Sequence, residues 1–430
     1  MSTESTQSPS SPASDAELPP SAFATDLGEQ SVGSAVRDYG IRLRSGDLGA
    51  LPAILGLIVL GVLFTALRPE TFLSNQNIAN LLVQALPVTI LAMGLVFVLL
   101  IGEIDLAAGV TGGVAAAVLA TLLSEQGQPW YVATLAGLGT GLLIGLVTGW
   151  LVAVLGIPSF VVTLAFFLGL QGITLRLIGE GGTVPVNDDV IVALANKNIP
   201  LVAGWALAWV CVIGYAAVAL FGWYRKRSRG LSRAPFALVV ARVVVVSLLL
   251  LGGTSLLSQD RARSPVVFLG GIPWGVLLVA LLLIICTFVL GRTAYGRHIY
   301  AVGGNAEAAR RAGINVTGVR ISVFMISSTI AAFSGIVAAS RLNSATPDAG
   351  TRTELLLAVG AAVIGGTSLF GGKGKALDAV LGGLVIAVIA NGLGLLGAKA
   401  YAQFLITGGF LLLAASVDAL ARRRRSATGR

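Results

Sequence analysis

Long apolar runs separated by short polar stretches fill the chain from about residue 50 onward. A helix needs about 20 mostly apolar residues to cross a bilayer. Runs near this length predict about 12 transmembrane helices, within a range of about 10 to 14. Their expected positions are 51–67, 73–101, 105–123, 131–155, 159–178, 201–223, 236–257, 273–291, 319–340, 355–370, 376–396 and 402–420. We therefore expect an all-α, polytopic transmembrane helical bundle.

Two of these segments are irregular. The 355–370 segment is short and rich in glycine, which is typical of a re-entrant or broken helix. The 105–123 segment follows its predecessor so closely that the two could form one interrupted element.

Basic clusters beside the apolar runs predict the orientation of the chain. Arg37, Arg42 and Arg44 precede the first span. Further clusters follow the sixth span at 225–233, the eighth at 292–320, the tenth at Lys373 and Lys375, and the last at 422–425. With the N-terminus inside, an even number of spans places every cluster in the cytoplasm, as the positive-inside rule requires. Both termini are therefore predicted to be cytoplasmic, together with the 292–320 loop.

Composition agrees with this assignment. The 430 residues are 55% hydrophobic and 11% charged, whereas a soluble domain has about 25% charged residues. The net charge of +9 is explained by the clusters beside the spans, so no nucleic acid is expected as a partner. Cys211 and Cys286 lie inside apolar runs, and His298 is the single histidine. This set cannot build an ordinary nucleophilic or zinc centre, so neither enzyme activity nor a metal site is expected.

The ends of the chain differ from the rest. Residues 1–45 are rich in Ser, Ala, Pro, Asp and Glu and lack an apolar run, which predicts a disordered cytoplasmic tail and no signal peptide. Residues 46–421 form the expected transmembrane domain, and residues 422–430 form a basic tail.

The 292–320 loop is the longest predicted cytoplasmic connection and contains a short helix signal, "NAEAARRAG". Asn305 suits an N-cap, and Glu307 in the first turn and Arg310 near the last complement the helix dipole. Gly313 can take the left-handed conformation that ends a helix. A helix of about two turns is marginal alone in water, so we expect it either to dock on a partner or to lie on lipid headgroups.

Glu307, Ala308, Ala309 and Gly313 match the EAA-x-x-x-G pattern of ABC importer permeases. The wider run "TAYGRHIYAVGGNAEAARRAGINV" (293–316) resembles the corresponding loop of ribose- and xylose-type sugar permeases. "GEIDLAAGVTGG" (102–113) resembles their IDLS-x-G signature, with Ala107 in place of Ser. Further stretches match in order at 156–164, 354–374 and 390–397. An extra pair of spans around 180–270, where the resemblance is interrupted, fits the xylose-type permeases better.

The resemblance implies the permease subunit of an ATP-driven ABC importer in the bacterial cytoplasmic (inner) membrane. It implies a monosaccharide as substrate, with a pentose such as xylose favoured, and a homodimer. A cytoplasmic ATP-binding subunit would dock on the 292–320 coupling loop, at Asn305, Glu307, Ala308, Ala309, Arg310 and Gly313. An extracytoplasmic sugar-binding protein would contact the outer loops 179–190 and 343–354.

The glycine-rich stretch 365–375 lacks Walker spacing, so this chain is expected to hold no cofactor and ATP-Mg is assigned to the partner. Two other functions stay open. One is an ABC permease for branched-chain amino acids, which the loop sequence favours less. The other is an ion-coupled secondary transporter, which typically shows internal repeats and an ionisable relay.

Polar residues inside the spans are candidates for the transport path. Glu103 and Asp105 lie where two apolar segments meet, and a carboxylate in a bilayer is normally buried in protein, paired or lining water. A structural cap at a broken helix is the favoured interpretation, ahead of sugar contact and proton coupling. Thr163, Gln171 and Asn391 have the neutral donors and acceptors that sugar hydroxyls need, although helix packing is the favoured interpretation of each.

Overall fold

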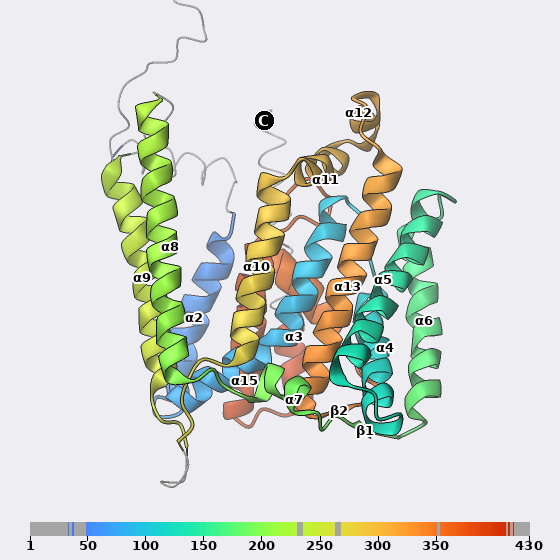
Figure 1. Ribbon diagram of the computed structural model, residues 1–430, viewed down its shortest axis with the longest axis horizontal. Helices are drawn as coiled ribbons and strands as arrows, with labels where there is room; N and C mark the ends of the chain where they lie inside the picture. The colour runs from blue at the N-terminus through green and yellow to red at the C-terminus, as the bar shows by residue number, and fades with distance from the viewer. Residues whose placement is uncertain are drawn as a thin grey trace, which may run out of the picture.

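The computed structural model describes residues 49–229, 235–262, 268–350 and 353–409, together with the isolated positions 33, 37, 412 and 416. The expected tails 1–45 and 422–430 lie outside the described residues. The described part is almost entirely helical (Figure 1). Its elements are α2 Leu51–Leu67, α3 Asn75–Leu100, α4 Ala108–Ala120 with the π-helical turn Thr121–Glu125, α5 Trp130–Ala153, α6 Ser159–Ile178, β1 Val184–Pro185, α7 Asp189–Asn196, α8 Leu201–Ser228, α9 Phe236–Ser258, α10 Trp274–Arg292, α11 Ala294–Gly304, α12 Ala306–Arg311, α13 Val316–Leu342, β2 Ser344–Ala345, α14 Glu354–Gly365 and α15 Ala376–Leu395.

Within these ranges, 9 helices are long and apolar enough to cross a membrane. They are α3, α4 with its π-helical turn, α5, α6, α8, α9, α10, α13 and α15. The apolar helices α2 and α14 are shorter. The polytopic helical bundle is therefore confirmed. The number 12 stays a prediction, because the segment expected at 402–420 is only partly described.

The two segments that look irregular in the sequence differ in the structure. The 12 residues of α14 extend about 18 Å, less than the roughly 30 Å hydrocarbon core, so the 355–370 segment is a short helix followed by a loop. By contrast, α3 and α4 are separate helices, with Gly102 at a φ of 75° between them. The central helix α13 packs against both. A single interrupted element is therefore the wrong description of that pair.

The bundle is organised around α13, which packs against α3, α4 and α5. Glycines of α5 allow the α5 and α13 backbones to touch. A Cβ placed on Gly141 would lie 2.6 Å from the carbonyl oxygen of Ser328, and one on Gly145 would lie 2.5 Å from that of Phe324. Small residues at such crossings are typical of membrane bundles, where close van der Waals packing replaces the hydrophobic effect between helices.

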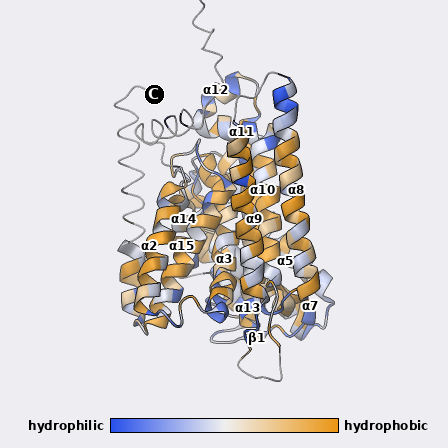
Figure 2. Cartoon of the chain, turned by 90° about the vertical axis from the view of Figure 1, so that its left-hand side faces the viewer, coloured by the Kyte–Doolittle hydropathy of each residue, from blue (hydrophilic) through white to orange (hydrophobic). Residues whose placement is uncertain are grey.

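The α8–α9 hairpin stands at the side of this bundle (Figure 1). Most of its contacts are between its own two helices, and none of the most apolar stretch of α9 is buried. Figure 2 shows apolar residues along both helices and hydrophilic ones at one end of α8.

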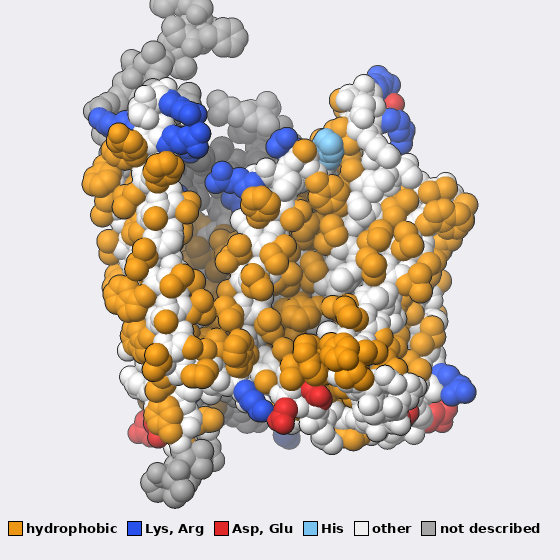
Figure 3. Space-filling model, in the orientation of Figure 1, with side chains coloured by type: hydrophobic (Ala, Val, Ile, Leu, Met, Phe, Trp, Pro, Cys, Tyr) orange, Lys and Arg blue, Asp and Glu red, His pale blue; other side chains and the backbone are white. Residues whose placement is uncertain are grey.

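The two ends of the bundle differ in charge. Figure 3 shows Lys and Arg side chains gathered at the end that carries α12, whereas the opposite end, which carries β1, shows both signs. We call these the α12 end and the β1 end. By the positive-inside rule, the α12 end is expected to face the cytoplasm.

The α5–α13 crossing predicts the effect of adding one methyl group. Gly145→Ala forces this backbone contact apart and is expected to lower the free energy of unfolding by about 1–3 kcal/mol, as overpacking does. Thermal unfolding of the detergent-purified protein measures this. Gly139→Ala is the matched control, because a Cβ there meets nothing within 4 Å. Equal melting temperatures for the two variants would contradict the assigned contact.

Candidate functional site

The short helix α12 has both of its predicted ends. The side chain of Asn305 caps its start by accepting a hydrogen bond from the backbone N–H of Ala308 at 2.9 Å. At its end, Gly313 has a φ of 82°. The N–H groups of Gly313 and Ile314 donate to the carbonyls of Arg310 and Ala309, each at 3.0 Å. This is the Schellman pattern, which satisfies the last carbonyls of the helix.

One face of α12 is charged and exposed. Glu307 pairs with Arg310 at 3.0 Å and with Arg311 at 3.2 Å, and all three side chains are more than half exposed. Ala308 is also exposed, whereas Ala309 is buried and fixes the helix against the protein. Exposed ion pairs contribute at most about 1 kcal/mol to stability. This charged face is therefore free to contact a partner at little cost to folding.

Helix α11 ties α12 to the spans and was not predicted from the sequence. The hydroxyl of Tyr295 lies 2.7 Å from that of Ser322 on α13, and the hydroxyl of Tyr300 donates to the Gly374 carbonyl at 2.7 Å. Burial raises the pKa of both tyrosines. The available signals were Thr293, whose side chain caps α11, and the buried residues Gly296, Ile299 and Val302 at three-residue spacing.

The turn between α3 and α4 lies towards the α12 end, beside α11. The backbone N–H of Gly372 donates to the carbonyl of Leu100 at the end of α3, at 2.8 Å. Asp105 is buried and accepts from the backbone N–H of Ala107 at 2.9 Å, which fits the interpretation as a structural cap. Glu103 instead pairs with Arg320 of α13 at 3.4 Å. This pair links the turn to the central helix.

The other predicted path residues do not assemble into one site. Thr163 lies beside the α3–α4 turn, but its hydroxyl donates to the Ser159 carbonyl of its own helix at 2.8 Å. Gln171 lies two turns further along α6 and is half-buried. The buried Asn391 of α15 exchanges two hydrogen bonds of 2.9 Å with Asn77 of α3. The contacts of Thr163 and Asn391 are those of helix packing.

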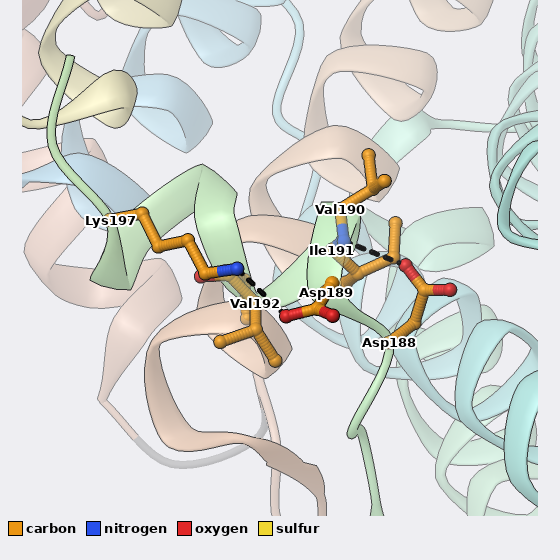
Figure 4. A network of polar contacts seen from close by, with 7 residues as sticks. Asp188, Asp189, Val190, Ile191, Val192 and Lys197 are labelled. Carbon is orange, nitrogen blue, oxygen red and sulfur yellow. Dashed lines mark hydrogen bonds and ion pairs between the residues drawn. The ribbon is translucent and has the colours of Figure 1, made fainter. Parts of the chain in front are cut away.

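At the β1 end, the two outer loops selected from the sequence meet. Strand β1 pairs antiparallel with β2, in the register Val184 to Ala345. Helix α7 follows β1 in the chain, and Figure 4 shows its polar contacts from close by. Asp188 caps α7 by accepting from Val190 N–H at 2.9 Å. Asp189 pairs with Lys197 at 2.7 Å, and this hydrogen bond lowers the pKa of Asp189.

A cavity of about 140 Å³ lies beneath this loop pair, between α4, α13 and the 344–354 segment. Its polar lining includes Ser334, Thr346 and Glu354, none of which was selected as a path residue. The segment approaches α4 closely, because a Cβ on Gly109 would lie within contact distance of the Gly350 carbonyl. The glycines at 109 and 113 were the available signal, but the sequence does not show what packs on them.

Residues 77–415 match the family described as "Branched-chain amino acid transport system / permease component". The chain belongs to this family. It is a multi-pass permease of the bacterial cytoplasmic membrane. No solved structure shows a significant match to the permease.

The permease is similar to three curated proteins over most of its length. The xylose transport system permease protein of Escherichia coli K12 is 36% identical over 382 residues, covering 89% of this chain and 94% of the relative. The Haemophilus influenzae protein of the same description is 34% identical over 380 residues, covering 88% and 98%. The ribose import permease protein of E. coli K12 is 32% identical over 371 residues, covering 85% and 92%. These three relatives are described as permeases for xylose or ribose.

The cap of α12 generates a prediction. Asn305→Ala removes the acceptor for the Ala308 amide and is expected to speed hydrogen exchange across 306–312 about fivefold, since losing an N-cap costs about 1 kcal/mol. Exchange followed by mass spectrometry measures this. Asn305→Asp keeps an acceptor and should exchange as the native chain does. The matched control Asn315→Ala removes the cap of α13 instead, and unchanged exchange in Asn305→Ala would contradict the assigned cap.

Proposed function

We propose that this permease is the transmembrane subunit of an ATP-driven ABC importer that carries a monosaccharide, most favourably a pentose such as xylose. The observation that carries the proposal is the agreement between two independent features. One is similarity over nearly the whole chain to the xylose permeases. The other is a capped, exposed, charged helix held at the α12 end.

The contacts of α11 and α12 support a coupling route. A cytoplasmic ATP-binding subunit would bind the charged face of α12. When the two ATP-binding subunits of the importer close around ATP, each would move the α12 helix to which it is bound. Tyr295 would carry this displacement to α13, and Tyr300 would carry it to the 366–375 loop before α15. The ATP-binding subunit would hydrolyse the ATP, and this chain would contribute only the helices that transmit the motion.

The β1 end supplies the surface for delivery. An extracytoplasmic sugar-binding protein would dock on the joined loops 179–190 and 343–354. The cavity below them would be the first space that a released sugar enters. The full importer would contain two copies of this permease, each with its own α12, so that two ATP-binding subunits act symmetrically.

A branched-chain amino acid is the second candidate substrate, and the description of the matched family favours it. The individual relatives favour sugar. Purified permease, its ATP-binding subunit and its binding protein, reconstituted in liposomes, decide between them. We expect ATP-dependent uptake of xylose and little uptake of leucine. The reverse ranking would overturn the assignment to sugar while keeping the importer.

Reversing the charge on α12 tests the coupling role. Glu307→Lys places a third positive charge beside Arg310 and Arg311 and is expected to abolish co-purification of the ATP-binding subunit and reduce uptake at least tenfold. Membrane insertion should be unchanged, because α12 lies outside the spans. Glu70→Lys is the matched control, since Glu70 is exposed in the loop between α2 and α3 at the other end. Full uptake by Glu307→Lys would refute the coupling role.

A further inference from the structure

A second concave surface lies at the α12 end, between the α8–α9 hairpin and α10. It is a cleft of about 640 Å³. Four exposed cations line it: Arg225 and Lys226 of α8, Arg242 of α9 and Arg292 of α10. Figure 3 shows Lys and Arg side chains on both sides of the hollow between α8 and α10. Three helices thus direct positive charge at one space.

These four cations have no ion-pair partner among the described residues. The acidic side chains that the structure describes at this end are engaged elsewhere. Glu307 pairs within α12, and Glu103 pairs with Arg320. Asp105 is buried and accepts from the backbone of Ala107, and Asp378 accepts from Thr367 and from the backbone of Lys375. The cleft therefore carries an uncompensated charge that attracts an anion.

The depth of the cleft shows which kind of anion fits. Arg242 lies six residues after Phe236, roughly 9 Å along α9, so its charge lies inside the apolar length of a helix with almost no protein covering it. A cation at this depth is costly unless it reaches headgroups or a counter-ion. The remaining walls are apolar and aromatic, with Phe221, Trp223 and Leu238, and Trp is enriched at the level of the headgroups.

We propose that this cleft binds an anionic phospholipid. The phosphate headgroup contacts Arg225, Lys226, Arg242 and Arg292, and the acyl chains lie along the apolar walls of α8 and α9. The lipid then fills the gap between the hairpin and the bundle, where direct protein contacts are few. Basic pockets between transmembrane helices on the cytoplasmic side recognise acidic headgroups in this way. The proposal is independent of the substrate and of the coupling role.

Native mass spectrometry of the full chain in non-ionic detergent tests the site, with phosphatidylglycerol and phosphatidylcholine of the same acyl chains as probes. We expect phosphatidylglycerol to bind at least tenfold more tightly. The double variant Arg242→Gln with Arg292→Gln should weaken that binding about 25-fold, from about fivefold for each basic side chain removed. Arg242→Lys with Arg292→Lys keeps both charges and should retain most of the binding.

The control is Arg229→Gln with Arg297→Gln, two exposed arginines of the same end that do not line the cleft. Equal affinity for the two lipids, or equal losses in the control and the cleft variants, would overturn the proposal. Millimolar inorganic phosphate should leave phosphatidylglycerol bound. Displacement by phosphate alone would mean a soluble-anion site, and loss of a dimer in the Gln variants without loss of lipid would mean an interface between copies. Either result would contradict the proposal that the cleft binds an anionic phospholipid.

Discussion

The contact between the α5 and α13 backbones is the constraint on which the rest of the bundle depends. Water cannot drive two apolar helices together inside a bilayer, so their association requires close packing, and glycine provides it. Gly141 and Gly145 leave no room for a side chain against α13. Because α13 also packs on α3 and α4, its position fixes most of the core. The glycine-rich run at 137–149 thus serves the packing of the bundle.

A helix fixed in this way is suited to transmit force. The chain leaves α12 through Gly313 and enters α13 three residues later, so α12 and α13 cannot move far independently. Glu103 joins α13 to the α3–α4 turn through Arg320, and Tyr300 joins α11 to the loop before α15. A displacement at α12 would therefore reach α13 first and, through these contacts, the α3–α4 turn and the loop before α15. Rigid backbone contacts along α13 would carry it onward to the cavity at the β1 end.

The sequence was informative wherever the signal is local. Periodicity and run length predicted the helical bundle, and Asn305 and Gly313 predicted both ends of α12, because caps depend on a few neighbouring residues. The sequence was less informative where distant segments meet. Asn391 was selected as a path residue, but only the fold shows that Asn77 satisfies its amide. Glu354 and Ser334 were missed because the cavity that they line depends on how the 344–354 segment lies over α4.

Helix α11 was missed for a different reason. Its buried residues Gly296, Ile299 and Val302 recur at a spacing of three, but the helix is only 11 residues long and contains three glycines, which disfavour a helix. Its stability comes instead from tertiary contacts, chiefly the two tyrosine hydroxyls and the close approach of Gly303 to the carbonyl of Leu100. Tertiary packing, rather than propensity, supplies most of the stability of such a short helix. The partners of these tyrosines, Ser322 and Gly374, lie far from α11 in the sequence, so only the fold shows the contacts. The same contacts are those that would connect an ATP-binding subunit to the spans.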